Sequence, residues 1–234
     1  MNEEKQKYSF IKRIKQVPWW GWLAGFLSLG IQAIFYYLSN FLAGAFGFTP
    51  ISTKVAVIDN AIPIIAVFAI PYVYSYIFWI SAGAVASLSG KEQFKKYIIG
   101  QLSAYFICFV IYIFMPTYMD RVDEGILEYS KSHWLLKLIY SLDGGKIAFN
   151  LFPSYHCLTS TYSYLIVRKN QNIAKWYRVY SLVLAVLIVM STLFIKQHYF
   201  LDALSGVFIA IATYVVVELV SKYNHKTTDL KKEK

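Results

Sequence analysis

The chain has 234 residues, of which 57% are hydrophobic and 18% aromatic, and its formal net charge is +10. Its mean hydropathy is +0.45, and the apolar residues are gathered in long runs, which excludes an ordinary soluble domain. A nucleic-acid partner would need one continuous basic surface, but most of the 23 basic residues lie in separate clusters between or beyond the apolar runs. We therefore expect a membrane protein and no nucleic-acid partner.

Six apolar runs have lengths close to those of membrane-spanning helices, and helices are expected because an open strand cannot satisfy its backbone groups in hydrocarbon. The runs cover about 20–38, 61–84, 97–115, 154–167, 179–195 and 203–220. Pro63 and Pro71 predict an irregular start or a kink in the second run. The fourth run is short and polar, with Thr159, Ser160, Thr161 and Ser163, which favours a place inside the bundle. The predicted fold class is therefore all-α: a single domain over residues 1–234 that spans the membrane with six transmembrane helices.

Basic residues mark alternate connections between these runs. They cluster before the first run, between the second and third, between the fourth and fifth, and after the sixth. Basic connections are typical of the cytoplasmic side, so we expect a multi-pass protein of the cell membrane with both termini in the cytoplasm. Residues 1–19 would be a cytoplasmic lead-in, residues 222–234 a basic cytoplasmic tail, and anionic membrane lipids would contact both.

The longest connection on the expected outer side covers residues 116–153. Within it, Trp134, Leu135, Leu138 and Ile139 recur at helical spacing. The spacing predicts a short amphipathic helix in the membrane interface. A connection of this length is usually functional when it is not disordered, and this one is too apolar to be disordered.

Three residues near the ends of apolar runs are candidates for chemistry. His156 begins the fourth run and His198 ends the fifth, so the hairpin between them returns both histidines to the outer face. Asp202 lies four residues after His198, where either a helix or a short turn would bring the two together. A carboxylate on one ring nitrogen would leave the other nitrogen as a nucleophile or base. Each residue alone also fits a structural role, as a capping pair at a helix end or an interfacial histidine.

Positive groups accompany the histidines. A helix that starts at Pro153 would leave the amides of Ser154, Tyr155 and His156 free as first-turn donors, which is typical of an anion site. Lys196 and Arg121 are candidate cations, although each alone could be an interfacial residue with its stem in lipid. Together this inventory suits phosphoryl transfer, for which we expect no metal site and no cofactor.

Two segments carry a resemblance to a known family. "FPSYH" and "STLFIKQHYFLD" resemble the second and third signatures of the type 2 phosphatidic acid phosphatase (PAP2) superfamily, P-S-x-H and S-R-x5-H-x3-D. The resemblance covers about residues 116–206. It implies an integral-membrane enzyme that dephosphorylates lipid phosphates or diphosphates.

The resemblance also implies roles for individual residues. His198 would attack phosphorus and carry the phosphoryl group as a phosphohistidine, and Asp202 would orient and polarise it. His156 would protonate the leaving group and then activate water. Ser154 and the amides near it, including that of Tyr155, would bind the phosphoryl oxygens. The residues with expected supporting roles are Ser191 and Asn150.

The chain departs from the family pattern in two motifs. The third motif has an arginine where this chain has Thr192, and Lys196 is a candidate replacement because the two positions lie about 40° apart around a helix. Arg121 can serve as the arginine of the first motif, but Val122 replaces the proline and Phe114 the lysine. This pattern is similar to the branch containing inositol phosphorylceramide synthase-like proteins, some of which transfer a phospho-headgroup to an alcohol.

Three functions are consistent with these residues. The first is a metal-independent phosphatase for phosphatidate, a phosphatidylglycerol phosphate or a polyprenyl diphosphate at the outer membrane face. The second is a phosphotransferase with the same phosphohistidine and an alcohol acceptor. The third is a non-enzymatic carrier that uses the pocket to bind anions or lipids. The sequence leaves the particular lipid and the oligomeric state open.

Overall fold

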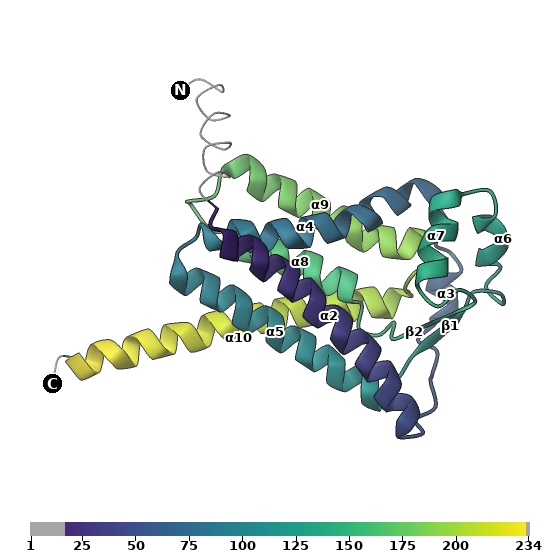
Figure 1. Ribbon diagram of the computed structural model, residues 1–234, viewed down its shortest axis with the longest axis horizontal. Coiled ribbons are helices and arrows are strands. Elements are labelled where there is room, and N and C mark those ends of the chain that lie inside the picture. The colour runs from purple at the N-terminus through teal and green to yellow at the C-terminus, as the bar shows by residue number, and fades with distance from the viewer. Residues whose placement is uncertain (1–16, 233–234) are drawn as a thin grey trace.

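The computed structural model describes residues 17–232, and its side chains are described as far as Asn224 (Figure 1). Most of the expected lead-in, residues 1–16, lies outside the described residues, as do the last two residues of the expected tail. The rest of that tail continues the last helix, α10, to Lys232.

Long helices form a bundle in which the chain passes repeatedly from one end to the other (Figure 1). Five described helices are long and apolar enough to cross a membrane. They are α2 (Trp19–Ala45), α4 (Ala69–Ser87) with the 3-10 turn η1 (Ala66–Phe68) before it, α5 (Lys91–Phe114), α9 (Lys175–Phe194) and α10 (Phe200–Lys232). The irregular start predicted for the second run is thus present as η1.

The fourth apolar run, which is the remaining expected span, forms the short helix α8 (Tyr155–Val167) in the interior of the bundle. It has 13 residues, ten of them buried, and its length of about 20 Å falls short of a hydrocarbon core about 30 Å thick. It packs mainly against α10, α9 and α4. The predicted count of six spanning helices is therefore not confirmed, whereas the expected place of this polar segment inside the bundle is what the structure shows.

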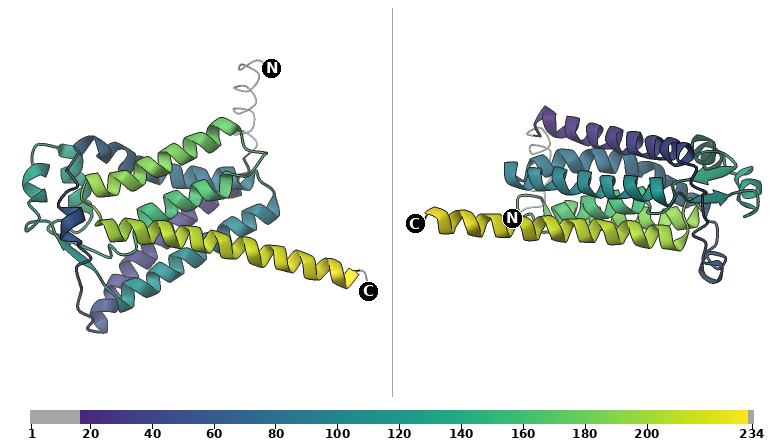
Figure 2. Two further views of the ribbon diagram at one scale, coloured as in Figure 1. Left: turned by 180° about the vertical axis from the view of Figure 1, so that it is seen from behind. Right: turned by 90° about the horizontal axis from the view of Figure 1, so that it is seen from below.

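One end of the bundle carries the short elements, and we call it the loop end (Figures 1 and 2). It contains α3 (Ala56–Asp59), α6 (Ile126–Ser130), α7 (Trp134–Leu142) and the antiparallel strands β1 (Tyr118–Asp120) and β2 (Ile147–Phe149). The short helix predicted around Trp134 is present as α7, with Leu136, Ile139 and Tyr140 on its buried face. The two strands were not predicted.

Helices α2 and α4 meet closely at the end away from the loops and separate towards the loop end (Figure 1). The close approach needs glycine: a Cβ on Gly25 would come within 2.4 Å of the carbonyl oxygen of Ile80, and one on Gly83 within 2.9 Å of the Gly25 backbone. Because the two helices separate beyond this crossing, the loop end has room for a cavity between them.

Candidate active site

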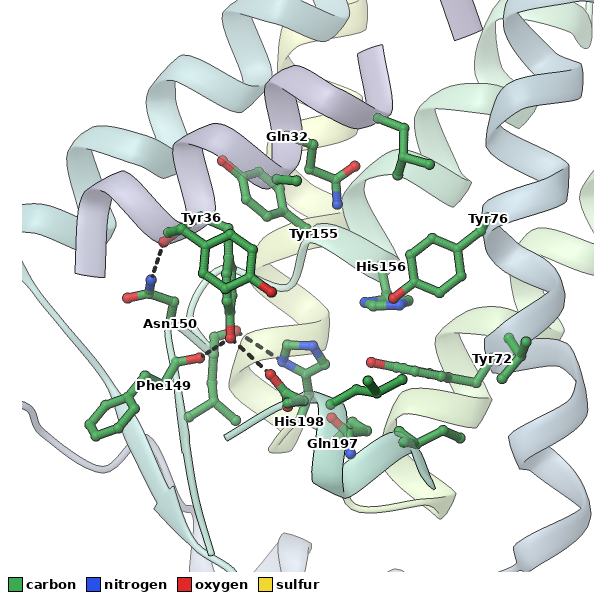
Figure 3. A pocket seen from close by; sticks show the side chains of 18 of the residues that line it. Gln32, Tyr36, Tyr72, Tyr76, Phe149, Asn150, Tyr155, His156, Gln197 and His198 are labelled. Carbon is green, nitrogen blue, oxygen red and sulfur yellow. Dashed lines mark hydrogen bonds between the residues drawn. The ribbon is translucent and has the colours of Figure 1, made fainter. Parts of the chain in front are cut away.

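Two histidines from distant parts of the chain face each other at the loop end. His156 is the second residue of α8, and His198 lies in the connection between α9 and α10. Their ring centroids are 6.2 Å apart. Both line a cavity of about 540 Å³ whose other walls come from α2, α4, α7 and the segment after β2 (Figure 3).

Backbone contacts hold the segments of the two histidines together. The Ser154 amide donates a hydrogen bond to the carbonyl oxygen of Asp202, with an N–O distance of 2.9 Å. Gly206 of α10 lies against the backbone of the same segment, where a Cβ would be only 2.4 Å from the carbonyl oxygen of Ser154. The start of α8 is therefore packed directly on the first turns of α10, which fixes one histidine relative to the other.

His198 is oriented by a backbone carbonyl group. Its Nδ1 lies 3.0 Å from the carbonyl oxygen of Leu151. A carbonyl oxygen only accepts, so Nδ1 carries the hydrogen and the lone pair is left on Nε2. An imidazole in this tautomer, with 10% of its side chain exposed, can act as a nucleophile through Nε2.

Asp202 is buried beside His198 without a direct hydrogen bond to it. Its Oδ2 is 3.8 Å from His198 Nδ1, which is too long for a hydrogen bond. The carboxylate instead accepts from the Thr53 hydroxyl at 2.6 Å and from the Tyr199 amide at 2.8 Å. The hydrogen bond expected from His198 to Asp202 is thus made to Leu151. No sequence pattern could reveal this, because every residue has a carbonyl oxygen.

His156 lies among aromatic side chains of α4. Its ring stacks on Tyr72 with centroids 4.1 Å apart and meets Tyr76 and Trp79 edge to face. Its Nε2 is buried and has no hydrogen-bond partner within the described residues. The sequence motifs gave no sign of this aromatic surrounding.

The other predicted site residues at the start of α8 mainly support its position. Ser154 caps the helix by accepting from the Cys157 amide at 3.3 Å, and its own amide is taken by Asp202 rather than free as expected. Tyr155 lines the cavity and donates to the Tyr105 carbonyl oxygen at 3.1 Å. These contacts make Ser154 a helix cap and leave Tyr155 at the cavity wall.

Asn150 and Ser191 also have structural partners. Asn150 adopts a positive φ of 54°, which asparagine tolerates better than most residues. Its side-chain amide donates to the Tyr36 carbonyl oxygen at 2.9 Å and thereby connects the cavity wall to α2. The Ser191 hydroxyl donates within α9, to the carbonyl oxygen of Ile188, and Ser191 is fully buried.

Neither predicted cation lines the cavity. α9 ends at Phe194, and Lys196 has a φ of 50°, so the helical offset used to compare Lys196 with Thr192 does not apply. The Lys196 ammonium donates to the Asp59 carbonyl oxygen at 2.6 Å, and its partial burial lowers the pKa of the group.

Arg121 is fully buried behind the cavity wall. Its Nη2 lies 2.6 Å from the Asp143 carboxylate and 3.2 Å from the Gln197 amide oxygen, while Nη1 donates to the carbonyl oxygens of Asp143 and Gly145. Asp143 and Gln197 themselves line the cavity. Arg121 therefore stands one side chain away from the cavity, and the sequence did not single out the two residues in between.

The family comparison agrees with this geometry. A family model of the PAP2 superfamily matches residues 44–216, a range that contains both histidines and Asp202. No curated protein and no solved structure matches the chain. The chain belongs to the PAP2 superfamily. Membership, together with the five apolar helices, indicates phosphatase-type chemistry on lipid phosphates in a membrane.

Proposed function

We propose that the protein is a metal-independent phosphatase that removes a phosphoryl group from a lipid phosphate or polyprenyl diphosphate through a phosphohistidine on His198. The single observation that carries this proposal is the pair of facing imidazoles, 6.2 Å apart, in one cavity. The tautomer of His198 supports it, since the Leu151 carbonyl oxygen leaves Nε2 with a lone pair.

The first chemical step forms a nitrogen–phosphorus bond. His198 Nε2 attacks phosphorus, the bond from phosphorus to the leaving oxygen breaks, and His156 gives that oxygen a proton. The His198 ring becomes positively charged, and the Asp202 carboxylate 3.8 Å from Nδ1 offsets this charge.

The second step frees the enzyme. A water molecule attacks the phosphorus atom, His156 accepts a proton from it, and the nitrogen–phosphorus bond breaks to release inorganic phosphate. His198 regains its lone pair and His156 is protonated again for the next cycle.

Two positive features lie near the cavity, one at its wall and one behind it. The first is the amino-terminal end of α8, where Tyr155 and His156 line the cavity and the helix dipole favours an anion. The second is Arg121, which is separated from the cavity by Asp143. We propose these two features, rather than Lys196, as the electrostatic support of the phosphoryl group.

The cavity walls favour an amphiphilic substrate. Tyr37 on α2, Val73 on α4 and Leu142 on α7 line the cavity and are also 66%, 41% and 74% exposed. Since α2 and α4 are candidate membrane spans, the cavity reaches the surface that would face lipid. A hydrocarbon chain can lie there while its phosphate reaches the histidines.

The distribution of charge supports an outward-facing site. The connections from α4 to α5 and from α8 to α9 lie at the end of the bundle opposite the loop end (Figure 1). Their basic residues, or those of the helix turns beside them, are Lys91, Lys95, Lys96, Arg168 and Lys169. Basic connections are retained on the cytoplasmic side, so we propose that the loop end faces the outside of the cell.

Phosphate release from purified protein tests the proposal. With EDTA present, the wild type should release phosphate from at least one member of a panel of phosphatidate, phosphatidylglycerol phosphate and polyprenyl diphosphate. His198→Ala should reduce the rate by at least about a thousandfold, because the nucleophile is lost. His133→Ala is the matched control, since His133 lies in the turn between α6 and α7 and does not line the cavity.

Three results would contradict the proposal. Activity that persists in His198→Ala would exclude the nucleophile. Transfer of labelled phosphate to an added alcohol without free phosphate would favour the phosphotransferase. Lipid transport by the wild type in liposomes, at a rate that is unchanged in a variant lacking both His156 and His198, would favour the carrier.

A further inference from the structure

One face of α4 surrounds the ring of His156. Tyr72, Tyr76 and Trp79 are spaced by four and three residues, so they lie on the same side of the helix. Their ring centroids are 4.1, 5.6 and 5.0 Å from that of His156, with interplanar angles of 16°, 83° and 61°. Figure 3 shows the Tyr72 ring parallel to the imidazole and Tyr76 beside it. We call these three side chains the aromatic box.

The box holds His156 in a different way from the hydrogen bond that holds His198. Within the described residues, Nε2 of His156 has no hydrogen-bond partner, so ring contacts restrict the imidazole. Two members of the box are held in place: Tyr72 and Trp79 are 5% and 3% exposed, and the Trp79 indole donates to the Ser160 hydroxyl at 2.9 Å. Ser160 lies one turn after His156 on α8.

A general acid at this place must carry a proton although it is buried, and burial opposes a charged imidazole. The ring of Tyr72 offsets part of this cost, since the face of an aromatic ring attracts a cation. Among the described residues, the titratable side chains whose rings contact the imidazole are Tyr72 and Tyr76 from α4 and His198 across the cavity.

We propose that the aromatic box positions His156 and favours its protonated form, so that Tyr72, Tyr76 and Trp79 are positioning residues for leaving-group protonation. This inference rests on the proposed phosphatase function. It adds a role for α4, which carries none of the residues identified from the sequence motifs.

The choice of leaving group separates this role from a structural one. An alkyl phosphate needs a proton on its leaving oxygen, whereas p-nitrophenyl phosphate has a much better leaving group and depends little on an acid. Single-turnover release of the alcohol or nitrophenol isolates the first step. Tyr72→Leu should slow alkyl ester cleavage by about 10- to 100-fold and nitrophenyl ester cleavage by less than about threefold.

Two variants serve as controls. Tyr72→Phe keeps the stacked ring and should restore nearly full cleavage of the alkyl ester. Tyr74→Leu removes a tyrosine from the same helix that does not line the cavity and should leave both rates unchanged. If Tyr72→Leu does not fold, Tyr76→Leu replaces it, because Tyr76 is 38% exposed and easier to lose.

The outcomes distinguish the box from the proposed function. The positioning role of the box is overturned if a folded Tyr72→Leu or Tyr76→Leu protein loses the same fraction of its cleavage rate for both esters, or loses none for either. The proposed phosphatase function is not affected by that result, because the wild type remains active. A wild type that cleaves neither ester, or a His198→Ala variant that cleaves both, overturns the proposed function and the box with it. Selective loss of alkyl ester cleavage, recovered by phenylalanine, supports the box.

Discussion

At the scale of single residues, the orientation of His198 depends on Thr117. The buried Thr117 hydroxyl accepts from the amides of Leu151 and Phe152 at 2.8 and 3.0 Å, and this holds the Leu151 carbonyl oxygen on His198 Nδ1. Thr117 is fully buried, so no water replaces its hydroxyl group easily.

Thr117→Val should therefore damage both stability and activity. The buried Leu151 amide and the partly buried Phe152 amide would lose their acceptor, which costs about 1–3 kcal/mol for a buried group that no partner replaces. The Leu151 carbonyl group would shift, and we expect the rate of phosphate release to fall by about 10- to 100-fold, as for a misplaced catalytic group. Thermal unfolding in detergent and phosphate release measure the two effects.

Thr213→Val is the matched control for this prediction. The Thr213 hydroxyl bonds within α10, to the carbonyl oxygen of Ile209, and Thr213 does not line the cavity. A Thr117→Val protein whose rate falls only in proportion to its folded fraction would contradict the role of Leu151 in orienting the nucleophile.

The sequence predicted those site residues that stand in a recognisable spaced motif. His156, His198 and Asp202 stand in two spaced motifs, and the structure brings them together. The surroundings of Arg121 and Lys196 depend on where α9 ends and on the pairing of Arg121 with Asp143. Neither feature has a local sequence signal, so the sequence could not show that these two cations lie outside the lining of the cavity.

At the scale of elements, the crossing of α8 and α10 decides whether the two motifs meet. Gly206 lies against the backbone of Ser154, where a Cβ would be 2.4 Å from the carbonyl oxygen and 3.1 Å from Cβ of Cys157. The first contact is with backbone, which cannot rotate away. The two helices can therefore approach this closely only with glycine at the crossing.

Gly206→Ala should force α10 away from α8. We expect a loss of about 1–3 kcal/mol of stability from overpacking, together with lower activity because the distance between His156 and His198 changes. Gly30→Ala is the control: nothing lies within 4 Å of a Cβ at Gly30, so stability should be unchanged or slightly higher, since alanine favours helix. Equal melting temperatures for the two variants would contradict the predicted clash.

Long elements were easier to predict than short ones. The five apolar helices follow from runs of about 20 residues, whose length is set by the membrane. The three-residue strands β1 and β2 are too short for any periodicity to appear in sequence. α8 shows the limit of the length argument, since its apolar residues face other helices rather than lipid.

At the scale of the whole molecule, the proposed outward orientation of the loop end rests on charge alone. Cysteine labelling on intact cells tests it, because the native Cys108 and Cys157 are buried and give little background. Ser132 is exposed at the loop end and Gln171 is exposed at the opposite end. A maleimide that cannot cross the membrane should label Ser132→Cys directly and Gln171→Cys only after permeabilisation.

The reverse labelling pattern would place the cavity in the cytoplasm. It would contradict the outward orientation without affecting the chemistry, since the histidine pair does not depend on the side it faces.

The overall architecture was predicted at the level of class, a helical membrane bundle with the candidate site residues at one end. The cavity between α2 and α4 was not, because it depends on the angle at which the helices cross at Gly25 and Gly83. Small residues such as Gly25 and Gly83 permit that contact, but their spacing in the sequence does not predict which helix each of them contacts.

The phosphohistidine on His198 is tested by trapping the phosphoryl group on the enzyme. Labelled lipid phosphate is mixed with the wild type, the reaction is quenched in alkali within one turnover, and peptides are mapped by mass spectrometry. We expect phosphate on His198 in the wild type and none in His198→Ala. With p-nitrophenyl phosphate, the phosphohistidine should be more abundant in His156→Ala, because the water that hydrolyses it is not activated. Phosphate released at the full rate with none on His198, or found on another residue, would contradict it.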